Sequence, residues 1–113
     1  MKNYLRQGAT IPTVAPSGGV ASGAPFLIGA IVGVAAVNAD EGAELEAHIE
    51  GVFTLPKATA DVIGQGETLY WDDTAGAFTT DDDTGSNPKA GVAFRAAGNG
   101  ATSMDVKLTP GVA

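Results

Sequence analysis

The sequence predicts a small all-β protein: a β-sandwich or barrel of about seven or eight short strands, with an extended N-terminal arm and at most one short helical turn. Sixteen glycines and six prolines separate short apolar runs, which is typical of strands joined by turns. Polar and apolar residues alternate cleanly over residues 44–50. The 113 residues are enough for one small domain. We place this β domain at 23–113, after an arm or edge segment at 1–22.

Prolines and glycines indicate where the first strands of the chain lie. The stretch TIPTVAPSGGVASGAP is poor in large apolar residues and in charge, and its prolines limit it to an edge strand or an extended arm. The next run, Ala24 to Val37, is shorter than the ~20 residues that a membrane helix needs. Gly29 and Gly33 interrupt it. We therefore expect two buried strands there, with a tight join near Gly29–Ala30, and no membrane partner.

The clearest strand lies in AELEAHIEGVF, residues 43–53. Period-two alternation indicates a strand with one wet face. The apolar residues share one side and the polar residues the other, namely Leu45, Ala47 and Ile49 against Glu44, Glu46, His48 and Glu50. In the following segment, Pro56 is placed to start a single helical turn over 58–63, which Gly64 would end.

The stretch GETLYWDDTAGAFTTDDDTG, residues 66–85, predicts a β-hairpin. Strand 67–72 would lead through a turn at 72–76 into a return strand at 77–80. Asp at the start of the turn and Gly at its end suit a type I turn with a left-handed glycine. An aromatic pair across the hairpin would contribute roughly 0.2–1 kcal/mol. We assign structural roles in this hairpin to Tyr70, Trp71, Asp72, Gly76 and Phe78.

Two further strands complete the expected sheet. In AGVAFRAAG, residues 90–98, one face would carry Val92, Phe94 and Ala96. In TSMDVKLTP, residues 102–110, the alternation places apolar side chains on one face and polar ones on the other. Those side chains are Met104, Val106 and Leu108 against Ser103, Asp105 and Lys107.

Charge is distributed unevenly along the chain. Residues 1–39 carry a net charge of +2, residues 40–83 of −11, and residues 84–113 of +2, for a total of −7. Nucleic-acid binders normally show a basic patch, because phosphate contacts supply most of their affinity. Six basic residues against thirteen acidic ones make nucleic acid an unexpected partner. The alternative is a single-stranded nucleic-acid-binding β-barrel that stacks bases on Tyr70, Trp71 and Phe78.

No motif in the chain predicts catalysis or a metal site. The absence of cysteine excludes disulfides and thiolate zinc sites. A calcium loop that starts at Asp81 would need Gly at position six and Glu at position twelve, but Ser86 and Val92 stand there. His48, the one histidine, lies between two glutamates, which favours an exposed polar position. A small hydrolase that uses Asp72, Asp73 or Asp81–Asp83 stays open as an alternative.

Nucleotide and acyl-transfer motifs are missing as well. The sequence contains no G-x-x-x-x-G-K-[ST] phosphate loop and no G-x-S-x-G nucleophile elbow. We therefore expect no catalytic residue, no bound metal, no cofactor and no small-molecule substrate.

The order of several short patterns resembles a known family. MKNYLRQG opens the chain, an apolar glycine-spaced hairpin follows, then EGVFTLPKA, GETLYWDDTAGAFT and a final GVAFRAA before VKL. Together these patterns are similar to small tailed-phage and prophage head proteins regarded as capsid cement, or decoration, proteins. Some relatives carry a recombinase label, which the missing phosphate loop does not support.

The resemblance implies a non-enzymatic protein on the outside of an icosahedral head, made in the cytoplasm of the bacterial host. It implies the major capsid protein as the partner and, as in many cement proteins, a trimer at local three-fold positions. The acid-free N-terminus suits an arm that orders on an acidic shell or adds a strand to a neighbouring sheet, with fraying as the alternative. The capsid-binding residues expected on this basis are Lys2, Tyr4, Leu5, Arg6, Ile11, Pro12 and Val14.

Overall fold

The computed structural model describes residues 10–109, which form nine β-strands and one short 3₁₀ turn. The all-β fold class is therefore confirmed, with one strand more than the largest expected number. In chain order the elements are β1 (Thr10–Val14), β2 (Pro25–Ile28), β3 (Ile31–Ala35), β4 (Glu44–His48), β5 (Gly51–Pro56), β6 (Thr68–Asp72), β7 (Ala77–Thr79), η1 (Asp83–Gly85), β8 (Lys89–Ala93) and β9 (Ser103–Leu108).

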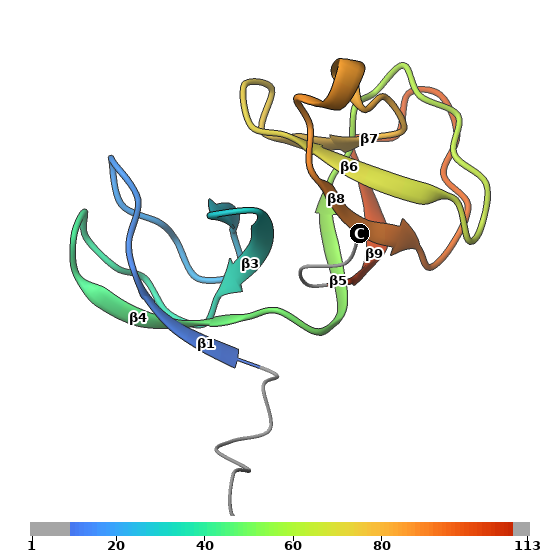
Figure 1. The fold of residues 1–113 in the computed structure, drawn as a ribbon. Coiled ribbons are helices and arrows are strands. Elements are labelled where there is room, and N and C mark those ends of the chain that lie inside the picture. The colour runs from blue at the N-terminus through green and yellow to red at the C-terminus, as the bar shows by residue number, and fades with distance from the viewer. Residues whose placement is uncertain (1–9, 110–113) are drawn as a thin grey trace, which may run out of the picture.

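The strands form two antiparallel sheets, which appear as two lobes in Figure 1. The first sheet has the order β1-β4-β3-β2, and the second has the order β5-β9-β8-β6-β7. The chain completes the first sheet before it begins the second. Among the described residues no helix is long and apolar enough to cross a membrane.

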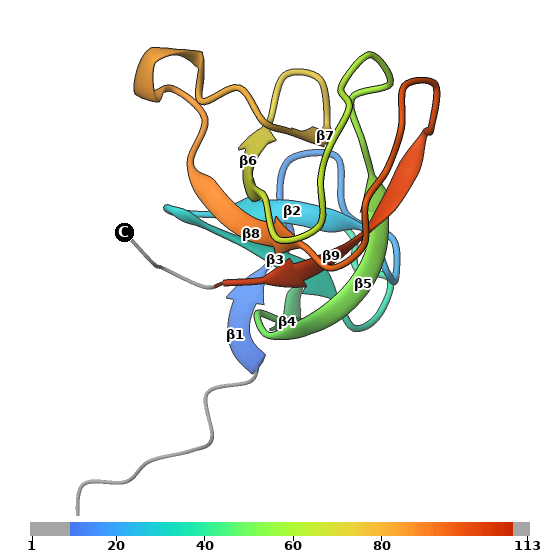
Figure 2. The same cartoon turned by 90° about the vertical axis from the view of Figure 1, so that its right-hand side faces the viewer.

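The second sheet curls strongly, as the view in Figure 2 shows for β5, β9 and β8. A single parallel bridge joins Lys57, directly after β5, to Phe78 in β7. The N–H of Ala58 donates to the carbonyl oxygen of Phe78 at 2.9 Å. These contacts bring the first and last strands of the sheet together, so the sheet forms a half-barrel around its apolar interior.

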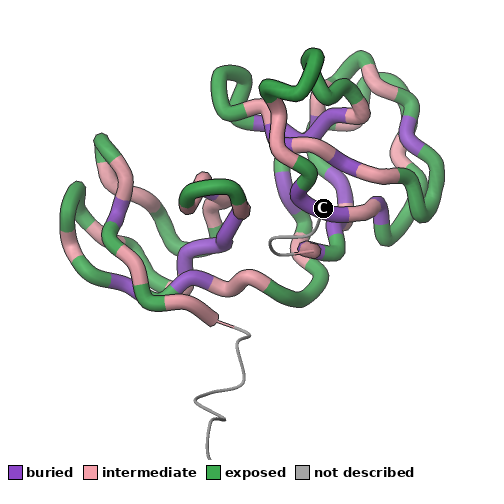
Figure 3. Tube along the Cα trace, in the orientation of Figure 1, coloured by how far each residue is buried: buried purple, intermediate pink, exposed green. Residues whose placement is uncertain are grey.

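The first sheet contributes to the core of the second, mainly through β3, with Leu27 of β2 packed against the same cluster. Val32 and Val34 of β3 belong to the same buried cluster as Leu55, Leu69 and Phe78. The opposite face of the first sheet packs its own smaller cluster, which includes Phe26, Ala35, Leu45 and Ala47. Figure 3 shows that most buried positions lie on the strands, whereas the loops are largely exposed. The two sheets therefore share apolar packing through β3.

The expected single strand over 43–53 is wrong, because the chain changes sheets within it. Leu45 and Ala47 are buried as the alternation predicts, but β4 ends at His48 and β5 begins at Gly51. Gly51 has a φ of +115°, which side-chain-bearing residues rarely adopt. This glycine therefore lets the chain change direction between the two sheets.

The helical turn expected over 58–63 is also wrong. Backbone groups that a helix would use there bond to distant segments instead. The N–H of Ala58 bonds to Phe78, and Ile63 exchanges N–H···O bonds with Ala97. The 3₁₀ turn lies at Asp83–Gly85 instead.

The expected face of residues 90–98 needs correction too. Ala93 pairs with Val106, whose side chain lies in the core, so Ala93 is buried. Val92 pairs with the outward-facing Lys107. Phe94 is exposed. The alternation in 102–110 is confirmed, since Met104, Val106 and Leu108 are all buried.

The structure describes only part of the N-terminal region. Residues 1–9 lie outside the described part of the chain. Residues 10–14 form β1, an edge strand that pairs with β4 over five positions, from Thr10 opposite His48 to Val14 opposite Glu44. The turn that follows is fixed by paired N–H···O bonds between Val20 and Ala39, both 2.9 Å long.

Gly91 lies where β8 and β9 approach closely. A Cβ atom at this position would lie 2.6 Å from the carbonyl oxygen of Lys107. We expect Gly91→Ala to lower the free energy of unfolding by about 1–3 kcal/mol, because the backbone must shift to admit the methyl group. Gly98 is the control, since a Cβ there meets nothing within 4 Å and Gly98→Ala should change stability by less than about 0.5 kcal/mol. Urea unfolding of both variants makes the comparison, and equal stabilities would contradict this packing.

Candidate functional site

The hairpin residues singled out in the sequence lie together in β6, β7 and the turn between them. Trp71 pairs with Phe78, and their ring centroids are 5.1 Å apart in an edge-to-face arrangement. Both rings are buried. The indole Nε1–H of Trp71 donates to Asp73 at 2.9 Å. This pair anchors the hairpin in the core.

Aspartates in the same region support turns. One carboxylate oxygen of Asp72 accepts the N–H groups of Thr74 and Ala75, both at 3.1 Å. Gly76 closes the turn with a φ of +67° and an N–H bond to the carbonyl of Asp72. Asp81 accepts the N–H of Asp83 at 2.9 Å. Within residues 10–109, no group of three or more His, Asp or Glu side chains could hold a metal ion.

Base stacking on this hairpin has no structural basis at two of the three aromatic positions. Trp71 is 3% exposed and Phe78 is fully buried. A nucleobase must reach the face of a ring to stack on it. Of the three rings proposed for stacking, Tyr70 alone is partly accessible.

Two polar residues near this hairpin, one buried and one partly buried, were missed by the sequence reasoning. Lys57 is 3% exposed, and its Nζ donates to the carbonyl oxygens of Ala58 at 2.7 Å and Thr59 at 3.4 Å. The alternation along β5 could have indicated that Lys57 is buried, since Lys57 continues the inward-facing series of Phe53 and Leu55. These contacts hold the segment after β5 in place, where it meets β7.

Asp61 is the second of these residues. Its carboxylate accepts the hydroxyl of Thr79 at 2.6 Å and the N–H of Thr80 at 3.2 Å. The loop between β5 and β6 is thereby tied to β7 by a carboxylate that is only partly buried. No local pattern in the sequence indicates this contact, because the partners are 18 and 19 residues apart.

His48 differs from its expected exposed position. It is half-buried at the end of β4, and its ring centroid lies 5.8 Å from that of Phe53 in β5. The histidine therefore packs where the chain passes between the sheets. The alternation did not predict the change of sheet after His48, which brings Phe53 of β5 against the histidine ring and reduces its exposure.

The edge strand β1 carries the candidate contact surface of the described chain. Its inner edge pairs with β4, while no described strand pairs with its outer edge. A groove of about 410 Å³ runs along the two strands, lined by Pro12, Thr13, Val14, Glu44, Leu45 and Glu46. An exposed strand edge offers unpaired backbone groups to a further strand.

The predicted capsid-binding residues fall into three groups. Lys2, Tyr4, Leu5 and Arg6 lie outside the described residues. Ile11 is half-buried and packs against the apolar cluster of the first sheet. Pro12 and Val14 are exposed on β1 and line the groove. Of the predicted residues that the structure describes, Pro12 and Val14 are thus accessible to a partner.

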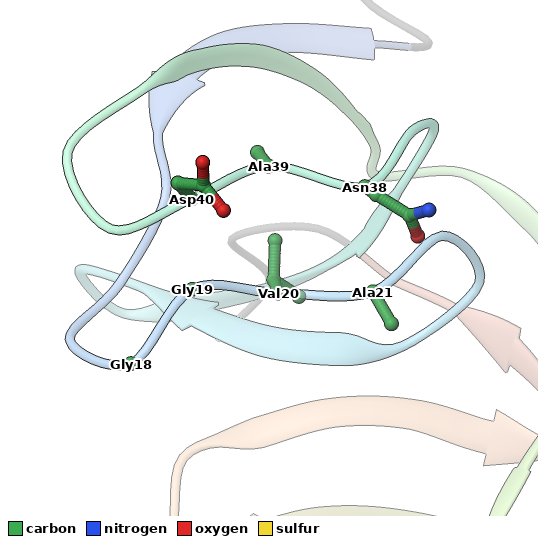
Figure 4. Close-up of a pocket in the computed structure, with 7 residues that line it drawn as sticks. All are labelled: Gly18, Gly19, Val20, Ala21, Asn38, Ala39 and Asp40. Atoms are coloured by element: carbon green, nitrogen blue, oxygen red, sulfur yellow. The ribbon is translucent and has the colours of Figure 1, made fainter.

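A second groove, of about 690 Å³, lies between the loops at Gly18–Ala21 and Asn38–Asp40. Figure 4 shows Val20 pointing toward Ala39 across it, with Asn38 and Asp40 at opposite ends. Several of its polar groups are used internally: the side-chain amide oxygen of Asn38 accepts the N–H of Ser22 at 2.7 Å, and the Gly18 N–H donates to Glu41 at 3.0 Å.

Comparison with protein families gives a match over nearly the full chain. A family model described as "Phage cement protein" matches residues 5–108. The chain belongs to the phage cement protein family. Comparison with curated proteins and with solved structures found no match.

The match spans β1 through β9, so both sheets belong to the unit that defines this cement family. Membership implies a structural role in a bacteriophage and a place on the phage capsid. The hairpin and the buried polar contacts described above then serve as a rigid scaffold.

The buried lysine provides a test of this scaffold. We expect Lys57→Ala to lower the free energy of unfolding by about 1–3 kcal/mol, because the packing of the side chain and its two carbonyl contacts are lost. Lys89→Ala removes an exposed lysine and should cost less than about 0.5 kcal/mol. Thermal and urea unfolding of both variants measure the difference. A Lys57→Ala protein as stable as Lys89→Ala would show that the buried ammonium has no structural role.

Proposed function

We propose that this cement protein binds the outer surface of an icosahedral phage head and stabilises contacts between major capsid subunits. Membership of the cement family is the observation that carries the proposal. The scaffold suits the role, since its buried aromatic pair, its tied loops and its shared core make a stiff body. We propose further that it acts without catalysis, as a trimer at local three-fold positions of the head.

The proposed head contact is the N-terminal segment together with β1. Lys2, Tyr4, Leu5 and Arg6 precede an edge strand that no described strand covers on its outer side. The segment carries two bases and no acid, while β4 beside it carries glutamates. We propose that the segment lies on the shell and that the edge of β1 pairs with a capsid strand.

Many weak contacts acting together would supply the binding energy. Two bases give little ionic affinity at physiological salt, because exposed charge pairs are screened. A trimer engages the shell three times, and each later contact forms at a high effective concentration. The proposal therefore predicts tight binding to assembled heads and weak binding to single capsid subunits.

Co-sedimentation with empty expanded heads of the phage that encodes the chain tests this function. We expect saturable binding by the full chain, and binding at least about tenfold weaker after deletion of residues 1–9. That deletion leaves β1 intact, so the two sheets should keep their stability. The matched control replaces both bases, Lys2→Gln with Arg6→Gln, and separates their charge from the rest of the segment.

The binding results separate the cement role from the choice of contact segment. Absence of binding by the full chain to expanded heads would contradict the cement role. Equal binding by the full chain and the deletion would retain the cement role and exclude the N-terminal segment as the contact. Heads of an unrelated phage serve as the specificity control.

A further inference from the structure

The outer face of the second sheet carries exposed apolar and basic side chains with no assigned role. Val52 of β5 and Phe94 after β8 are each 44% exposed. Lys107 of β9 pairs in register with Val52 on one side and with Val92 of β8 on the other. We call this surface the basic face, and it comprises Val52, Val92, Phe94, Arg95 and Lys107.

Arg95 is held in place on this face. Its guanidinium lies 5.6 Å from the centroid of the Phe94 ring, and its Nε donates to Asp105 at 3.0 Å. Asp105 also accepts the hydroxyl of Thr54 at 2.8 Å. Since Asp105 is engaged by Arg95 and Thr54, the remaining charge of the face is that of Lys107. Exposed aromatic residues beside arginine are the composition found at the centres of protein interfaces.

The groove along β1 and β4 has the opposite character. Val14 is 56% exposed and stands opposite Glu44 in the register of the two strands. Pro12 stands opposite Glu46 in the same way. We call this surface the acidic groove, with the lining given above and a volume of about 410 Å³. The groove thus combines an exposed valine with two glutamates, whereas the basic face combines an exposed valine with a net charge of +1 from Arg95, Lys107 and Asp105.

The two surfaces lie on different sheets, and therefore in the separate lobes of Figure 1. Two complementary patches at different places on one protein can meet in a two-fold dimer, in which the contact forms twice, or head to tail, in which each copy presents one patch to each neighbour. A head-to-tail contact closes into a ring when the rotation between neighbours allows it, and the proposed trimer requires this arrangement.

We propose that copies of this chain associate head to tail, with the basic face of one copy seated on the acidic groove of the next. Lys107 would then face Glu44, and Val52 and Phe94 would cover Val14. The inference deepens the proposed function and rests on it for the closed ring of three. Val14 contacts the neighbouring copy in this arrangement, which leaves the shell contact to residues 1–9 and the outer edge of β1.

A charge swap tests the contact in the absence of heads. Sedimentation velocity of the full chain over a range of concentrations should show self-association that weakens as salt rises. Lys107→Glu and Glu44→Lys should each weaken it at least about tenfold. The double variant carries both changes in every copy, so each contact regains opposite charges. Its association should return to within about threefold of the unchanged protein.

Matched controls make the same charge changes elsewhere. Lys89→Glu and Asp82→Lys alter exposed residues outside both surfaces and should leave the association unchanged. A monomer at every concentration, or a double variant as weak as the single ones, would overturn the proposal. So would loss of binding to a single-stranded oligonucleotide in Lys107→Glu while self-association is kept, since the face would then serve nucleic acid. Binding to heads is measured separately, so failure here leaves the proposed function standing.

Discussion

The structure depends on the cover that β3 gives to the second sheet. A five-stranded half-barrel cannot enclose its own apolar interior on every side, so the open side needs another element. Val32 and Val34 fill that place and join the cluster around Leu55 and Phe78. The chain must therefore build the first sheet next to the second, and Gly51 provides the change of direction between them. Because the lobes share this core, the outer edge of β1 and the outer face of the second sheet are held in a fixed relation.

Sequence patterns predicted what depends on nearby residues. Alternation, turn residues and glycines gave the all-β class, the β2–β3 join and the β6–β7 hairpin. The patterns failed where distant segments decide the outcome. Nothing local shows that β4 and β5 belong to different sheets, because alternation continues through the break. The loop after β5 follows bonds to Phe78 and Ala97 instead of its own helix signal. The prolines of the candidate site predicted that it forms an edge strand or an arm. The groove beside this strand could not be predicted, because it depends on the pairing of Val14 with Glu44, 30 residues later in the chain.

The arrangement explains why aspartates and aromatic residues gather in one stretch, because both kinds of side chain hold the hairpin together. Trp71 and Phe78 stabilise the hairpin from inside, and Asp72 and Asp73 satisfy N–H groups at its turn. Elsewhere, Glu44 and Glu46 lie along β4 of the first sheet, and the outer face of the second sheet carries Lys107 and the Arg95–Asp105 pair. The proposed function needs contacts to a shell and to neighbouring copies, and a scaffold with several distinct surfaces can supply both.

A cementing role is tested most directly by the temperature at which expanded heads come apart, recorded by calorimetry with and without saturating protein. A protein that binds the assembled shell more tightly than separated subunits must stabilise the shell by mass action. Decorated heads should come apart at a higher temperature than bare heads, and the temperature should return to the bare value when the protein is removed. Decorated heads that come apart at the same temperature as bare ones would contradict a cementing role.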